Sequence, residues 1–258
     1  MKKTIQLLDG PIFPSLTKLA LPVVGASLVQ MAYNMVDMIW IGRVGSNAVA
    51  AVGAAGMYLW LSNGIASLSK VGGQIKVAHS LGAGDYEDAA AYARSALQLG
   101  IFTGVLFGIL AVLLHGPLIG FFNLNSPEVI GQAEIYLMIT SGLVVFNFIN
   151  TIMTGIITAM GNSQTPFLAT CMGLGVNFLL DPVLIFGMGP FPEMGVAGAA
   201  LATILAQAIV TFTLAFSVRK DRMVFDKIHL LQKPDRKHMA TIVRIGVPMS
   251  LQSMIFTF

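Results

Sequence analysis

The chain has 258 residues, of which 55% are hydrophobic and only 10% are charged, and its mean hydropathy is +0.78. This composition excludes an ordinary soluble globular domain, in which about a quarter of the residues are charged. The apolar segments are long and lack the alternation of barrel strands, so the sequence predicts an all-α polytopic membrane protein. Since the net charge is only +3, the placement of the basic residues matters more than their sum.

The first predicted span covers residues 16–45, LTKLALPVVGASLVQMAYNMVDMIWIGRVG. Its apolar part, between Lys18 and Arg43, is long enough to cross a hydrocarbon core of about 30 Å. One residue is unexpected at this depth, because a carboxylate such as Asp37 costs several kcal/mol in the membrane unless it faces a polar interior. Residues three or four apart share a helix face, which here carries Asp37 with Ser27, Gln30 and Asn34. We therefore expect Gln30 and Asn34 to line a cavity.

The rest of the chain predicts further helices. Apolar segments predict spans at 48–81, 91–114, 127–160, 166–187 and 196–218, and a seventh apolar segment starts at Met239 and runs to Phe258. Asp85 is expected to cap the third helix, and Ser126 with Pro127 to open the fourth. The predicted organisation is a six-helix lobe at 1–218, a charged linker at 219–238 and the start of another lobe at 239–258.

Basic residues lie mostly on one side of these spans. Thirteen of the fifteen precede the first span or lie on connections of the same side: Lys2, Lys3, Lys18, Lys76, Arg94, Arg219, Lys220, Arg222, Lys227, Lys233, Arg236, Lys237 and Arg244. By the positive-inside rule, the N-terminus and the linker are cytoplasmic. A nucleic-acid patch is the weaker explanation of the linker, because the linker has no aromatic pattern for stacking bases.

An internal repeat suggests that the lobe has a second copy. KLALPVVGASL at 18–28 aligns without gaps on RIGVPMSLQSM at 244–254, and six spans separate the two segments. Parallel repeats of this kind occur in secondary transporters, in which two bundles enclose the substrate path. A chance match in an apolar chain is the alternative. If the repeat is real, a second six-helix lobe follows Phe258 and completes a 6+6 architecture.

A second acid, Asp181, lies in the fifth predicted span one turn after Asn177 and directly before Pro182. Proline removes a backbone donor, which frees a carbonyl near the acid. Asp37 and Asp181 each lie six residues before the outer end of their span, about 9 Å inside the rim. Tyr136 and Thr203 reach a similar depth in their own spans. The sequence thus predicts a cluster of oxygen-bearing side chains in the outer half of the bundle.

This cluster suggests cation coupling. Two nearby carboxylates at low dielectric do not both ionise at low cost, so the pair would carry a proton. The same oxygens would also suit Na⁺, a hard cation. The alternative is that both acids are structural and only hydrogen-bonded to Asn177 or Tyr136.

Enzyme chemistry finds no support in the sequence. It contains no HExxH, nucleophile elbow, P-loop or Cys/His metal spacing. Histidines 79, 115, 229 and 238 stand at predicted helix ends or in connections, where we expect them to be solvated. Neither an enzymatic activity nor a resident cofactor or metal is expected, apart from a coupling H⁺ or Na⁺.

Several motifs together resemble one transporter family. They are the first span, the LGAGDYEDA and AMGNSQTP turns, NFLLDPVLIFG, and GVAGAALAT at the start of the sixth span. In this order they resemble the N-terminal lobe of multidrug and toxic compound extrusion (MATE) transporters. The resemblance implies two six-helix lobes, a bacterial or archaeal cytoplasmic membrane, and export of organic cations or amphiphiles driven by H⁺ or Na⁺. It also implies a coupling site at Asp37, Asn177, Asp181 and Thr203, with Tyr136 beside it.

Two alternatives to the antiporter stay open at this point. The same superfamily includes lipid-linked sugar flippases, but those usually have a more cationic cavity. A non-transporting membrane scaffold would be expected to carry a folded extramembrane domain, which this sequence does not show.

Overall fold

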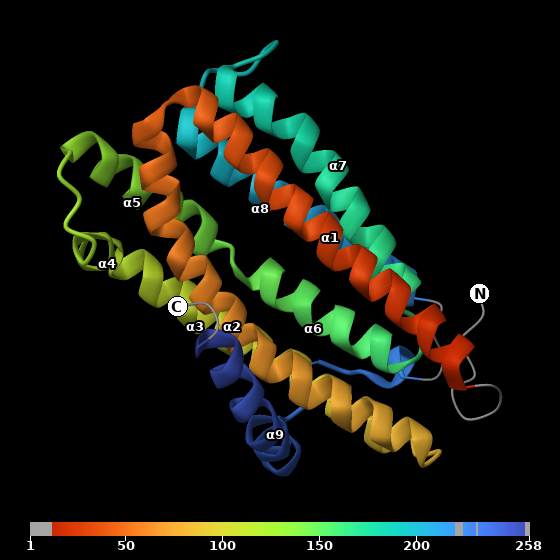
Figure 1. Ribbon diagram of the computed structural model, residues 1–258. Coiled ribbons are helices and arrows are strands. Elements are labelled where there is room, and N and C mark those ends of the chain that lie inside the picture. The colour runs from red at the N-terminus through yellow and green to blue at the C-terminus, as the bar shows by residue number, and fades with distance from the viewer. Residues whose placement is uncertain (1–11, 220–223, 231, 256–258) are drawn as a thin grey trace.

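The computed structural model describes residues 12–219, 224–230 and 232–255, and this part of the chain is entirely helical (Figure 1). Its elements are α1 (Ile12–Val44), α2 (Ser46–Gly82), α3 (Tyr86–Leu113), α4 (His115–Gly120), α5 (Pro127–Gly142), α6 (Val145–Ala159), α7 (Gln164–Phe186), α8 (Gly195–Val218), the 3₁₀ turn η1 (Phe225–Lys227) and α9 (Arg236–Ile255). Of the basic residues used to orient the chain, Lys2, Lys3, Lys220 and Arg222 lie outside the described residues.

The prediction of an all-α, multi-span protein is confirmed. Within the described residues, α1, α2, α3, α7 and α8 are long and apolar enough to cross a membrane. The pair α5 and α6 passes the same test when it is counted as one bent span. Six spans therefore precede the linker, as the hydropathy pattern predicts.

The fourth predicted span is not the continuous helix that we expected at 127–160. It is broken into α5 and α6, which meet at an angle of 48°. The break follows Ser141 and Gly142, a pair that often marks helix kinks because glycine stabilises a helix poorly. A glycine on α3 helps to set the bend, since a Cβ at Gly108 would stand only 2.7 Å from the Ser141 carbonyl oxygen.

Small residues allow the helices to approach closely, as is usual in membrane bundles. A Cβ at Gly198 of α8 would lie 2.4 Å from the Leu184 carbonyl oxygen of α7, and one at Gly72 of α2 would lie 2.3 Å from the Ile242 carbonyl oxygen of α9. Helix α2 is the central element, in contact with α3, α5, α6 and α9, while α1 lies along α7 (Figure 1).

The helix caps agree with the sequence in part. The Asp85 carboxylate accepts a hydrogen bond of 2.9 Å from the Asp88 N–H, which confirms the predicted cap of α3. Pro127 opens α5 as predicted, but the Ser126 side chain makes no capping bond. Helix α9 begins at Arg236, before the predicted Met239, because the Asp235 carboxylate accepts from the N–H groups of the first turn.

Candidate functional site

The first acid lies near the end of α1 and points into the bundle. Asp37 is only 9% exposed, although most of α1 is exposed in the described lobe. Tyr33 lies one turn earlier on the same helix, and its hydroxyl is buried. The four-residue spacing to Asp37 is a signal from which Tyr33 was predictable, but the sequence analysis missed it.

The second acid lies on the neighbouring helix α7. Asp181 and Asn177 are both fully buried, and the Asn177 amide donates a hydrogen bond of 3.0 Å to the Asp181 carboxyl. Pro182 lies inside the same helix. Because proline has no N–H, the Phe178 carbonyl has no helical partner four residues later. The carbonyl therefore adds an acceptor one turn from Asp181.

Residues from four helices meet around these acids. Tyr33 and Tyr136 interact electrostatically with both Asp37 and Asp181, and each lies near Thr203. Asp37 and Asp181 also interact with each other. Thus α1, α5, α7 and α8 bring together the residues that the sequence placed at one depth.

Several oxygens of this cluster are buried without a hydrogen-bond partner among the described residues. They are Tyr33 Oη, Asp37 Oδ1, Asn177 Oδ1, Asp181 Oδ2 and Thr203 Oγ1. Buried polar atoms are normally paired, because desolvation without a partner costs about 1–3 kcal/mol. Neither Asp37 nor Asp181 forms an ion pair with a described basic residue. A proton or a cation bound between the acids would satisfy several of these oxygens at once.

The other predicted cavity residues lie apart from this cluster. Gln30 and Asn34 are exposed in the described lobe, whereas Asp37 is turned inward. The polar face of α1 is therefore split between the buried cluster and the open side of the lobe. Periodicity predicted a shared face but not this difference in depth.

Aromatic rings close the end of the cluster nearest the rim. The Trp40 ring lies 6.3 Å from Phe178 and 6.1 Å from Phe186, both on α7. The Arg43 guanidinium lies over the Trp40 ring at 4.9 Å. The guanidinium thus makes a cation–π contact, and no ion pair joins Arg43 to Asp37 among the described residues.

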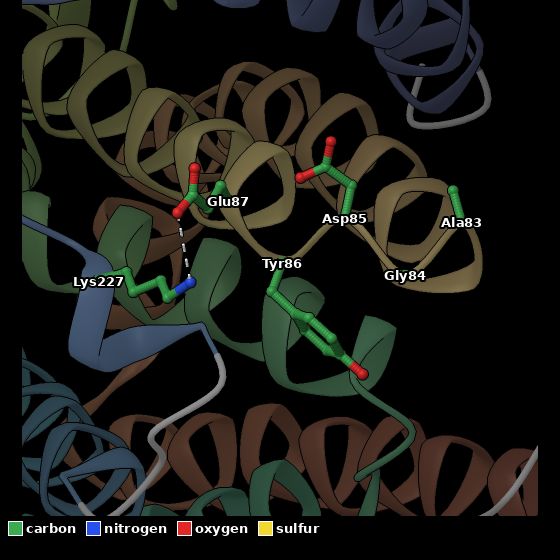
Figure 2. Close-up of a pocket in the computed structure, with 6 residues that line it drawn as sticks. All are labelled: Ala83, Gly84, Asp85, Tyr86, Glu87 and Lys227. Carbon is green, nitrogen blue, oxygen red and sulfur yellow. Dashed lines mark ion pairs between the residues drawn. The ribbon is translucent and has the colours of Figure 1, made fainter.

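A shallow pocket of about 430 Å³ lies elsewhere, at the turn between α2 and α3 (Figure 2). It is lined by 83–87 and Lys227, whose ammonium lies 3.8 Å from the Glu87 carboxylate. This pocket is separate from the acid cluster, which lies toward the other end of α2.

Comparison with known proteins was made for sequence and structure. The profile of the MatE family matches residues 22–183. The chain is 31% identical over 243 residues to the probable multidrug resistance protein NorM of Thermotoga maritima, covering 94% of this chain and 52% of that protein. It is 24% identical over 258 residues to the multidrug export protein MepA of Staphylococcus aureus, covering 96% of this chain and 54% of that protein. The chain thus spans about half the length of these relatives.

Solved structures give the same picture. A structure described as the outward-facing conformation of a multidrug resistance MATE family transporter matches with a TM-score of 0.88 and 29% identity, over 98% of this chain and 55% of that one. A structure described as the inward-facing conformation matches with a TM-score of 0.79 and 27% identity, over 90% of this chain and 54% of that one. The structure of a MOP superfamily transporter from Pyrococcus furiosus matches with a TM-score of 0.86 and 28% identity, over 98% of this chain and 55% of that one. With its helical spans, its buried acid pair and these matches, the chain belongs to the MatE family of multidrug and toxic compound extrusion transporters.

Proposed function

We propose that this chain forms the N-terminal lobe of a cation-coupled antiporter that exports organic cations or amphiphilic compounds. The observation that carries the proposal is the buried pair Asp37 and Asp181, which faces other unpaired oxygens and has no basic partner among the described residues. Ionisable residues at membrane depth are rare and usually mark ion or substrate pathways. The acid pair is therefore the coupling site in this proposal.

The coupling ion is H⁺ or Na⁺. A proton shared between the carboxyls would relieve their repulsion and turn one of them into a hydrogen-bond donor. Na⁺ would use the carboxylate, amide and hydroxyl oxygens of Asp37, Asn177, Asp181 and Thr203, all of which are hard ligands. In both cases the bound charge changes the cost of burying Asp37, and with it the preferred position of α1 against α7.

The proposed cycle is alternating access between two lobes. Ion entry at the acid pair shifts the balance between cavity shapes, because the ion binds them with different affinity. Exposed methionines on α1, Met31, Met35 and Met38, offer an adaptable apolar surface for substrates of varied shape. The relatives described above bear multidrug names, so we do not propose the flippase alternative.

In the proposed orientation, the N-terminus, the α2–α3 turn and the 219–238 linker face the cytoplasm. This follows from the positive-inside rule and from the clustering of basic residues on that side. The acid pair then lies in the outer half of the membrane, where it meets ions that enter from outside.

The test is transport by the full-length protein in proteoliposomes. A pH gradient and a Na⁺ gradient are imposed separately, and efflux of a fluorescent organic cation is followed. We expect one gradient to drive efflux, and Asp37→Asn and Asp181→Asn each to lower the rate at least tenfold. Asp85→Asn is the matched control, because asparagine caps a helix about as well as aspartate. Wild-type rates in both site variants would overturn the proposal.

A further inference from the structure

The position of His238 beside the charged linker predicts a solvated side chain, and the structure contradicts this. The His238 side chain is only 18% exposed and lies between two carboxylates from different parts of the chain. Its Nδ1 is 2.6 Å from Asp235 Oδ2, and its Nε2 is 3.2 Å from Asp88 Oδ1. The contact joins the first turn of α9 to the start of α3.

Both ring nitrogens therefore face acceptors. A neutral imidazole has a single N–H and can donate to only one carboxylate, while its other nitrogen presents a lone pair. The imidazolium has two N–H groups and can donate to both. The full set of contacts that the structure places around His238 thus requires the charged form of the ring.

The groups around His238 favour this arrangement. The His238 ring stands edge-on to the Tyr92 ring, with 4.4 Å between the centroids. The Lys76 ammonium lies 4.9 Å from the centroid of the same Tyr92 ring. Ser80 at the end of α2 donates a 2.6 Å hydrogen bond to the second oxygen of Asp88. The titratable and charged groups near His238 are thus Asp88 and Tyr92 on α3, Lys76 on α2, Asp235 before α9, and Arg236 and Lys237 in the first turn of α9.

The charge of Asp235 is not expected to change near neutral pH. The hydrogen bond from His238 holds the pKa of Asp235 below its usual range. Asp235 therefore stays ionised over the interval, about pH 5 to 8, in which histidines change charge.

We propose that His238 is a proton-binding switch that holds α9 against the α2–α3 hairpin when its imidazole is charged. The charged ring donates to both carboxylates, whereas a neutral ring keeps only one of these two hydrogen bonds. The site lies toward the end of α2 opposite the Asp37 cluster.

Other contacts also join α3 to the linker and α2 to α9 at this end of the lobe. The side chains of Arg94 and Gln98 on α3 bond to the linker at Leu230 and Gln232, and Gly72 lets α9 pack on α2 at backbone distance. His238 is the one histidine of the described residues whose ring joins α9 to α3.

The test measures the distance between α9 and the hairpin. Spin labels are placed at Ala83→Cys and Ala240→Cys, both exposed, in the full-length protein with Cys171→Ser in nanodiscs. From about pH 5 to pH 8, we expect the ratio of short to long distances to fall about three- to fivefold, the range for a partly exposed charge pair. The distance measurement does not depend on transport, so its result tests the His238 proposal separately from the proposed antiport.

Variants separate the imidazole from the rest of the protein. His238→Gln is neutral at every pH and should show the long distance throughout, whereas His238→Arg keeps a charged pair of donors and should stay short. Asp235→Asn retains the helix cap but loses a carboxylate, and should weaken the response. His229→Gln, at an exposed histidine of the same linker, should behave as wild type. A pH response that persists in His238→Gln, or none in the wild type, would overturn the proposal.

Discussion

At the scale of single residues, the buried acids Asp37 and Asp181 form the proposed coupling site of this lobe. Sequence alone located both, because a carboxylate in an apolar segment is costly and therefore conspicuous. The structure adds that one Asp181 oxygen accepts a hydrogen bond from Asn177, while the other, like Asp37 Oδ1, is buried without a partner among the described residues. The two carboxyls thus differ in their surroundings although they lie at matched depth.

Tyr33 is the residue that the sequence analysis overlooked. Its hydroxyl is buried without a partner and lies near Thr203 and both acids. We expect Tyr33→Phe to weaken the apparent affinity for the coupling ion about three- to tenfold, because a polar group near the bound ion is lost. The measurement is the ion dependence of efflux in proteoliposomes.

The control for this prediction is Tyr86→Phe, since the Tyr86 side chain is exposed at the start of α3. Its ion dependence should match the wild type. An unchanged ion affinity in Tyr33→Phe would contradict a role for the Tyr33 hydroxyl at the site.

At the scale of helices, glycine positions set how closely the elements pack. Gly72 and Gly56 both lie on α2. A Cβ at Gly72 would stand 2.3 Å from the Ile242 carbonyl oxygen, whereas a Cβ at Gly56 would meet nothing within 4 Å. The same substitution should therefore have opposite effects at the two positions.

We expect Gly72→Ala to lower the free energy of unfolding by about 1–3 kcal/mol, because α9 must move away from α2. Gly56→Ala should leave it unchanged or raise it by up to about 1 kcal/mol, because alanine favours the helix. The measurement is the thermal midpoint of each variant in the same detergent. Equal midpoints for the two variants would show that the close α2–α9 contact does not limit stability.

The bend between α5 and α6 is also a property of the elements. The Ser141–Gly142 pair is of a kind that often marks helix kinks, but the expectation of one span followed hydropathy, which shows one continuous apolar segment. The bend depends on α3, whose Gly108 makes room for the Ser141 carbonyl. A contact between segments so far apart in the chain leaves no local signal in the sequence.

At the scale of the whole molecule, the orientation of the lobe is a prediction that labelling can check. In a Cys171→Ser background, Asn125→Cys lies between α4 and α5, and Ala83→Cys lies between α2 and α3; both positions are exposed. An impermeant maleimide applied to intact cells should label Asn125→Cys. It should label Ala83→Cys only after the membrane is permeabilised, because basic residues keep that side in the cytoplasm. The reverse pattern would contradict the proposed orientation.

The sequence by itself determined the class of the protein, the number of spans, the acid pair and the family resemblance. Each of these depends on hydrophobic length, helical periodicity or ordered motifs, which are local in the chain. Only the tertiary structure decided that Gln30 and Asn34 lie apart from the buried cluster, that Tyr33 joins it, and that His238 lies between Asp88 and Asp235. Those outcomes depend on how helices distant in sequence pack together, and packing is a property of the assembled lobe.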